Sequence, residues 1–81
     1  MRLQYTDRFR RSHESAPDAV RRAFAKQARH LQQDLRHPSL RAKKYDETRD
    51  IWQARVDRSW RFYFVMRGDV CLLLDLISHP K

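Results

Sequence analysis

The segment Gln53–Phe64, with the sequence QARVDRSWRFYF, alternates apolar and polar side chains on both sides of a polar centre at Arg58. This period of two predicts two short strands joined by a turn. In such a hairpin Arg55 lies opposite Arg61 on one face. Like charges that face each other across neighbouring strands are destabilising, so we expect an anionic partner to neutralise the pair.

The other positions of the hairpin follow from the same symmetry. Gln53 lies opposite Tyr63 beside the two arginines, and Trp52 lies opposite Phe64 on the apolar face. Two guanidinium groups, an amide and a phenol on rigid strands suit a phosphate oxyanion better than an apolar ligand. The alternative is that both arginines extend into solvent over a basic sheet.

Whole-chain composition predicts one compact, basic domain over residues 1–81. The chain holds 18 Lys and Arg against 10 Asp and Glu, a net charge of +8, and 41% of its residues are hydrophobic. That apolar fraction is too high for a disordered basic tail, and the charge would attract a polyanion or an acidic protein. The amino-terminal MRLQYTDRF has no apolar targeting segment and no apolar run could span a bilayer, so we expect a cytoplasmic protein that binds no membrane.

A strand and two helices are predicted before the hairpin. Residues 1–5 read as a strand with Leu3 directed inward, and Thr6 is placed to cap a short helix that continues to about residue 11. Ser15 and Asp18 resemble a capping box, with Pro17 in the first turn of a longer helix that ends before Pro38. The apolar residues of that helix recur at steps of three and four and predict one buried stripe: Val20, Phe24, Ala28, Leu31 and Leu35.

A polar connection, residues 36–50, precedes the hairpin, and a last apolar strand, VCLLLDLIS, follows it at Val70–Ser78. A connection of this length is uncommon in a small domain and is often functional. The order is therefore strand, two helices and three antiparallel strands. It predicts an α+β fold in which two amino-terminal helices pack on a four-stranded, mostly antiparallel sheet.

The register of the last strand decides where its polar residues lie. If the turn that follows Met66 pairs this residue with Val70, Asp75 lies beside Arg61 and His79 lies at the end of the same face. A shift of one residue would send the Asp75 carboxylate into the core without a partner, which is costly. We therefore expect the first register, which also pairs Phe64 with Leu72 and Phe62 with Leu74.

A histidine and further cations complete the parts needed to cleave an RNA phosphodiester. In that reaction a base removes the 2′-hydroxyl proton, cations stabilise the charge on the phosphoryl oxygens, and an acid protonates the leaving 5′ oxygen. Histidine side chains titrate near neutral pH, so His79 suits the acid or base role. We expect RNA contacts from Arg41, Lys43, Lys44 and Tyr63, the last by stacking on a base.

The sequence contains no pattern for a bound metal or other cofactor. His13, His30 and His37 have no metal-ligand spacing with a cysteine or an acidic cluster, and no glycine-rich phosphate loop is present. We therefore expect neither metal nor cofactor. The single cysteine, Cys71, lies in the apolar last strand and is expected to be a core residue rather than a nucleophile.

In size and element order nearly the whole chain resembles the RelE/ParE superfamily of bacterial toxins from type II toxin-antitoxin pairs. The most specific segments are HPSLRAKKYDETRDIWQARVDRSWRFYF, residues 37–64, and GDVCLLLDLISHPK, residues 68–81, which resemble the RelE-like branch. The resemblance implies a four-stranded sheet with two helices on one side and an antitoxin whose acidic or extended segment wraps the toxin. Ribonuclease members of the family cut mRNA in the ribosomal decoding site, whereas ParE-like members poison DNA gyrase.

The resemblance also implies roles for individual residues. Arg55 and Arg61 match basic residues that bind phosphate, and His79 matches a terminal acid or base found in some members. Lys43 and Lys44 resemble basic residues that precede the second strand of the family. A contribution from His37 or Lys81 stays open.

Our preferred interpretation is a ribosome-dependent endoribonuclease that arrests translation. Arg61 would hold the scissile phosphate, Arg55 would stabilise the transition state and His79 would transfer the proton. One alternative is a gyrase-inhibiting toxin without chemistry of its own, which would need none of these roles. Another is a non-toxic basic module whose paired arginines bind an acidic peptide.

Overall fold

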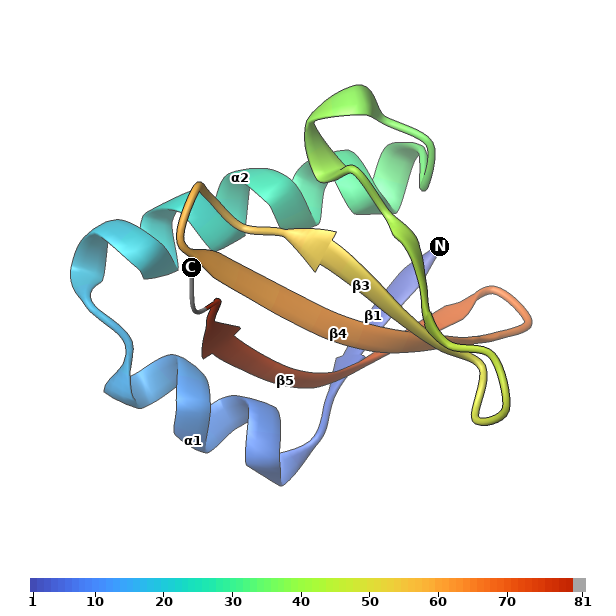
Figure 1. Ribbon diagram of the computed structural model, residues 1–81, viewed down its shortest axis with the longest axis horizontal. Coiled ribbons are helices and arrows are strands. Elements are labelled where there is room, and N and C mark those ends of the chain that lie inside the picture. Colours follow the sequence, from blue (N-terminus) through green and yellow to red (C-terminus); the bar gives the residue numbers. More distant parts are fainter. Residues whose placement is uncertain (80–81) are drawn as a thin grey trace.

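The computed structural model describes residues 1–79, which form a five-stranded sheet and two helices (Figure 1). The elements in chain order are β1 (Arg2–Tyr5), α1 (Asp7–Ser15), α2 (Asp18–Gln33), the short 3-10 helix η1 (Pro38–Leu40), β2 (Lys43–Asp46), β3 (Ile51–Arg55), β4 (Trp60–Arg67) and β5 (Val70–Ser78). The strand order is β1-β5-β4-β3-β2, and β1 and β5 are the parallel pair. The predicted α+β class is confirmed, with five strands where four were expected.

The additional strand is β2, which lies at an edge of the sheet inside the predicted polar connection. Its sequence, KKYD, has no apolar alternation, and its side chains alternate only between exposed and half-buried. Charged residues on a short edge strand prevent pairing with other chains, and they also remove the pattern by which strands are predicted. The connection is thus shorter and more ordered than its sequence indicates.

The start of α1 agrees with the prediction, whereas the end of α1 and the start of α2 differ from it. Thr6 caps α1 as predicted, because its hydroxyl accepts a hydrogen bond from the Phe9 amide at 3.0 Å. Ser15, however, belongs to the end of α1, and α2 begins at Asp18 after Pro17, with no side-chain cap. The predicted capping box was therefore wrong, because α1 continues through the residue that was assigned to the cap.

One face of the sheet and the apolar stripe of α2 form the core. Helix α2 lies behind the sheet in Figure 1, and the ring centroids of Phe24 and Phe62 are 5.2 Å apart in an edge-to-face contact. The predicted stripe is confirmed, with Val20, Phe24, Ala28 and Leu31 buried and Leu35 partly buried after the helix has ended. The side chains on the other face of β3 and β4 are left uncovered by α2. No helix within residues 1–79 is long and apolar enough to cross a membrane.

The hairpin of β3 and β4 has the predicted register. Arg55 is paired with Arg61, Gln53 with Tyr63, and Trp52 with Phe64. The apolar face holds Ala54, Phe62 and Phe64, all nearly inaccessible to solvent. The alternation of the sequence was sufficient here because one face is fully buried, and a slip by one residue would place two phenylalanines in solvent.

The predicted register of β4 and β5 was wrong. Arg67 pairs with Val70, so the turn has only two central residues, Gly68 and Asp69, and Gly68 adopts the positive φ of 61° that such a tight turn requires. Phe64 then pairs with Leu73, and Tyr63 pairs with Asp75. The additional residue, Leu74, forms a bulge that keeps Leu73 and Leu76 on the buried face.

The bulge is fixed by the residue that caps α1. The Thr6 amide donates to the Leu73 carbonyl at 3.1 Å, and the Thr6 hydroxyl donates to the Leu74 carbonyl at 3.0 Å. One threonine thus starts a helix and satisfies a backbone oxygen that the irregular ladder leaves free.

We expect Thr6→Ala to lower the free energy of unfolding by about 1–2 kcal/mol, because both hydroxyl bonds are lost. Urea denaturation of the purified protein measures this value. Thr6→Ser keeps the hydroxyl and should lose much less, and Thr48→Ala, at an exposed turn position, is the matched control. A Thr6→Ala protein as stable as the wild type would contradict the double role of Thr6.

Candidate nucleic-acid interface

Four arginines meet where the β3–β4 hairpin turns and η1 ends, and we call them the arginine cluster: Arg41, Arg55, Arg58 and Arg61. Arg55 and Arg61 are opposite each other on the strands, and Arg58 lies in the turn between them. Arg41 follows η1 in the left-handed conformation, at φ 46°. Lys43 of β2 pairs with Gln53 of β3 in an antiparallel ladder. If this register is extended by two residues, Arg41 lies opposite Arg55.

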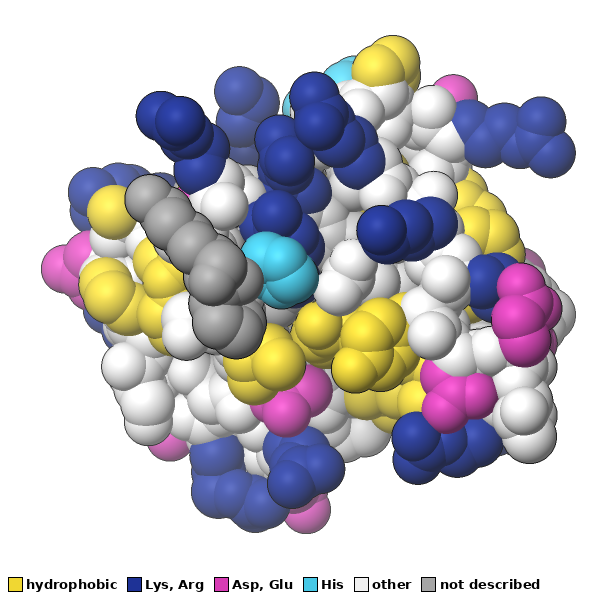
Figure 2. All heavy atoms as spheres, in the orientation of Figure 1, with side chains coloured by type: hydrophobic (Ala, Val, Ile, Leu, Met, Phe, Trp, Pro, Cys, Tyr) yellow, Lys and Arg dark blue, Asp and Glu magenta, His cyan; other side chains and the backbone are white. Residues whose placement is uncertain are grey.

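The cluster lies on the side of the sheet that α2 does not cover. Figure 2 shows Lys and Arg side chains gathered over this side of the molecule, with acidic side chains mostly toward its borders. Sequence reasoning missed Arg58, although its place at the centre of the turn between two arginine-bearing strands was a usable signal. The structure therefore extends the predicted pair to a group of four.

Electrostatic repulsion within the cluster acts on its central member, Arg55. Partial burial, followed by the positive charges of Arg41, Arg61 and Arg58, lowers the pKa of Arg55 below its ordinary value. Arginine nevertheless remains protonated in proteins. Among residues 1–79 none of the four guanidinium groups forms an ion pair with a carboxylate. Within residues 1–79 the cluster is therefore a concentration of positive charge that no carboxylate neutralises.

Arg61 is held in place by the main chain. Its Nη1 donates to the carbonyl oxygens of Asp57 at 2.8 Å and Trp60 at 2.9 Å. The Asp57 carboxylate itself accepts from the amides of Ser59 at 2.8 Å and Trp60 at 2.9 Å, which fixes the turn. Two carbonyls thus orient the guanidinium without neutralising it, and its Nε and Nη2 have no hydrogen-bond partner in the part of the chain that the structure describes.

Asp75 does not lie beside Arg61 as the sequence predicted. Its carboxylate accepts a hydrogen bond from the Ser12 hydroxyl at 2.6 Å and from the Leu76 amide at 2.8 Å, and Arg8 lies 3.8 Å away. The bulge at Leu74 shifts Asp75 to the level of Tyr63 and toward α1. The carboxylate that was expected to offset the arginines is occupied by a helix instead.

His79 lies next to the turn of the hairpin. Its amide donates to the Ser59 carbonyl at 2.5 Å, and its side chain is exposed. Ile77 pairs with Arg61, and residues two apart in an extended chain face the same side, so the imidazole belongs to the side of the sheet that carries the arginine cluster. Lys81, whose contribution was left open, lies outside the described residues.

Two tyrosines and an amide continue this side of the sheet toward β2. The Gln53 amide donates to the Tyr63 hydroxyl at 2.9 Å, which orients the phenol ring. The ring of Tyr45 lies 4.9 Å from that of Tyr63, edge to face, and Tyr45 is 60% exposed. Lys43 of β2 lies directly opposite Gln53 of β3, on the same side of the sheet. Sequence reasoning missed Tyr45, although an aromatic residue directly after two lysines is typical of nucleic-acid contacts.

Lys44, a predicted RNA contact, and His37, whose contribution was left open, have other partners. Lys44 forms an ion pair with Asp50 and lies 5.2 Å from the ring of Trp52, on the opposite side of β2 from Lys43. His37 stacks on His30 with ring centroids 3.7 Å apart at the start of η1. His37 lines a pocket together with Arg41, whereas Lys44 is not brought to the arginine cluster.

Other reactive groups are poorly placed for chemistry. Cys71 is inaccessible to solvent, and burial raises the pKa of its thiol to about 12. Such a thiol stays protonated at neutral pH and is a weak nucleophile. Within residues 1–79 no group of three or more His, Cys, Asp and Glu side chains could hold a metal ion.

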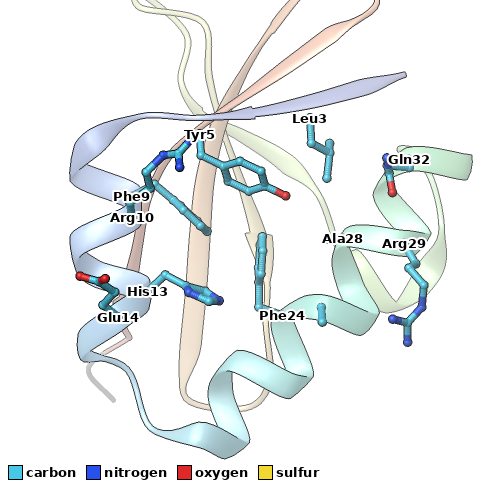
Figure 3. Close-up of a pocket in the computed structure, with 11 residues that line it drawn as sticks. Leu3, Tyr5, Phe9, Arg10, His13, Glu14, Phe24, Ala28, Arg29 and Gln32 are labelled. Atoms are coloured by element: carbon cyan, nitrogen blue, oxygen red, sulfur yellow. The ribbon is translucent and has the colours of Figure 1, made fainter.

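A separate cleft of about 660 Å³ opens between β1, α1 and α2 (Figure 3). Its floor is aromatic, formed by Tyr5, Phe9 and Phe24, whose rings are grouped between the two helices in the close-up. Arg10 stands on the α1 side and Arg29 on the α2 side. Glu14 also lines the cleft on the α1 side, so the cleft is apolar inside and holds two arginines and one glutamate at its borders.

We expect Arg55→Gln to raise the melting temperature by a few degrees, because the charge that three neighbours repel is removed. Added sodium chloride should raise the melting temperature of the wild type more than that of the variant, since salt screens the same repulsion. Thermal denaturation at low and high salt measures both effects. Arg22→Gln, on the exposed face of α2, is the control, and an equal response of the two variants would contradict the repulsion.

Comparison with known proteins gives results at the level of structure only. No protein-family model matches the sequence, and no curated protein matches it significantly. A chain of the archaeal RelE–RelB complex from Pyrococcus horikoshii OT3 superimposes with a TM-score of 0.80 at 19% identity, covering 99% of this chain and 96% of that one. The YoeB/ParE toxin from Agrobacterium tumefaciens gives 0.79 at 15% identity, covering 99% of this chain and 100% of that one.

The isolated RelE toxin of E. coli superimposes with a TM-score of 0.78 at 13% identity, covering 99% of this chain and 85% of that one. Identities this low carry no information on individual functional residues, whereas the coverage extends over nearly the whole of both chains. The chain therefore has the fold of the RelE and YoeB/ParE toxins.

Proposed function

We propose that the protein is the toxin of a type II toxin-antitoxin pair and a ribosome-dependent endoribonuclease that cuts mRNA and arrests translation. The observation that carries this proposal is the arginine cluster, which lies on an open sheet face with no carboxylate partner among residues 1–79. The fold shared with RelE and YoeB/ParE toxins supports it.

The chemistry uses the RNA itself as the source of the nucleophile, so it requires no metal. The 2′-oxygen loses its proton to a base and attacks the adjacent phosphorus, and the bond from phosphorus to the 5′ oxygen breaks. The products are a 2′,3′-cyclic phosphate and a 5′-hydroxyl, the latter protonated by an acid. Negative charge grows on the phosphoryl oxygens during this step, and fixed cations lower its energy.

The geometry supports different proposed tasks for the two strand arginines. Arg61 is anchored by two carbonyls through Nη1 and can present Nε and Nη2 to a phosphate as a bidentate pair. Arg55 has no carboxylate partner among residues 1–79, and its repulsion from three neighbours is relieved when charge accumulates on the phosphate. It would therefore bind the transition state more tightly than the ground state.

The remaining residues would complete the site. His79, exposed beside the hairpin turn, would transfer the proton. Tyr63 and Tyr45 would stack on bases, and Lys43 and Arg41 would contact phosphates along the strand. Lys44 has the weakest claim to such a contact, because Asp50 and Trp52 already bind it.

An antitoxin is the proposed protein partner. Solved neighbours include the RelB–RelE complex from Methanococcus jannaschii and a YoeB–YefM complex from Staphylococcus aureus. The cleft between β1, α1 and α2 suits an acidic, amphipathic segment of such a partner, because its floor is aromatic and its border arginines, Arg10 and Arg29, outnumber its one carboxylate, Glu14. The net charge of +8 favours the same kind of partner.

We expect Arg29→Glu to weaken the complex with the cognate antitoxin at least several-fold, because the new carboxylate repels the acidic segment at the border of the cleft. Co-purification and titration calorimetry measure the affinity. Arg22→Glu makes the same charge change on the same helix outside the cleft. Equal losses in both variants would show that net charge alone drives the association and that the cleft is not the docking site.

We expect Arg61→Ala to reduce mRNA cleavage by about 10²- to 10³-fold, the cost of removing one fixed donor to a developing oxyanion. His79→Ala should lose about 10²- to 10⁴-fold through the proton transfer. Single-turnover cleavage of an mRNA bound to purified ribosomes, with mapping of the new 5′ ends, gives both rates.

The control for Arg61→Ala is Arg67→Ala, an exposed arginine at the other end of the same strand. It should cleave like the wild type. A folded Arg61→Ala protein that cleaves at the wild-type rate would remove Arg61 from the site, and intact mRNA with every variant would reject the ribonuclease.

A further inference from the structure

A buried glutamine on α2 connects the two chain segments that carry the arginine cluster. Gln27 is only 6% exposed, and its Nε2 donates to the Ser39 carbonyl at 3.0 Å and to the Arg55 carbonyl at 2.8 Å. The Ser39 hydroxyl donates in return to the Gln27 Oε1 at 2.9 Å. Both ends of the amide are therefore satisfied by η1 and β3 together.

The Gln27 side-chain amide lies where the ladder between β2 and β3 has ended. The ladder between β2 and β3 reaches only to the pair of Lys43 and Gln53. Two residues further along, Arg41 adopts a left-handed conformation and leaves the strand. The Arg55 carbonyl thus has no neighbouring strand on this side, and Gln27 supplies the donor that a strand would have supplied.

The same amide opposes a repulsion. Among the charges that lower the pKa of Arg55, that of Arg41 has the largest effect, so the segment after η1 and the end of β3 are pushed apart in the free protein. The two N–H bonds of Gln27 join the backbones of those segments, at Ser39 and at Arg55 itself. A leucine at this position would fill the space but would leave the part-buried carbonyls of Ser39 and Arg55 without the donors that Gln27 supplies.

We propose that Gln27 is a positioning residue that holds Arg41 and Arg55 together as one anion site, acting through the backbone of Ser39 and Arg55. The proposal rests on the proposed function because it concerns the same basic face. It adds a residue on the buried side of the sheet, which touches no substrate and sets the spacing of two side chains that do.

The test uses inorganic pyrophosphate as the probe and the Nε–H signals of the arginines in ¹⁵N NMR spectra as the readout. In the wild type we expect Arg41 and Arg55 to respond to pyrophosphate together, with one dissociation constant. Gln27→Met conserves length and burial but has no hydrogen-bond donor for the carbonyls of Ser39 and Arg55. It should weaken binding by about threefold or more and should separate the two responses.

A double-mutant cycle separates positioning from general destabilisation. In the Arg41→Gln background Gln27→Met should cost almost nothing further, because the residue that it positions is already absent. Gln33→Met, at an exposed position of the same helix, should leave binding unchanged. If Gln27→Met does not fold, Ser39→Ala removes the bond to the amide oxygen from an exposed position and should weaken the coupled response in the same direction.

Losses that add fully in the double variant would overturn the proposal, and so would a folded Gln27→Met protein with wild-type affinity and a joint response. Independent responses of Arg41 and Arg55 in the wild type would overturn it as well. The outcome is separate from that of the ribonuclease assay. A coupled pyrophosphate site in a protein that leaves mRNA intact would support the role of Gln27 and reject the ribonuclease.

Discussion

The repulsion between Arg55 and Arg61 is the constraint on which the rest of the structure depends. A hairpin with this pair on one face needs a strong apolar face on the other, and Ala54, Phe62 and Phe64 provide it against α2. Burial of each phenylalanine contributes about 1.5–3 kcal/mol, more than the roughly 1 kcal/mol that two like charges about 4 Å apart cost in water. The core thus fixes the arginines in proximity, and the uncovered face retains their charge.

Backbone carbonyl groups hold Arg55 and Arg61 of the arginine cluster in place. Arg61 is oriented by the carbonyls of Asp57 and Trp60, and the segment of Arg55 is held through its own carbonyl by Gln27. Asp75, the carboxylate that the sequence placed beside Arg61, is turned toward Ser12 and Arg8 by the bulge at Leu74. Backbone dipoles position the guanidinium groups of Arg55 and Arg61 without neutralising them, which leaves their positive charge available to an anion.

The sequence was sufficient to predict those helices and strands whose buried side chains recur at a regular spacing. The stripe of α2 and the pairing of Arg55 with Arg61 were predictable because a slip would expose several large apolar side chains. The register of β5 was not, since a tight turn at Gly68 and a bulge at Leu74 together change it, and neither alters the apolar pattern VCLLLDLIS. Strand β2 and the contacts of Gln27 could not be predicted from the sequence either. Both depend on how far the ladder between β2 and β3 extends, and no residue pattern marks its end.

Cleavage of mRNA through Arg55 and Arg61 is tested most directly in cells. Expression of the wild type should produce new mRNA 5′ ends inside translated frames within minutes, with intact chromosomal DNA, and both the cuts and the arrest of translation should disappear when Arg55 and Arg61 are replaced together. Unchanged mRNA accompanied by DNA breaks would contradict the account, because the arginine cluster would then serve binding to gyrase rather than cleavage of RNA.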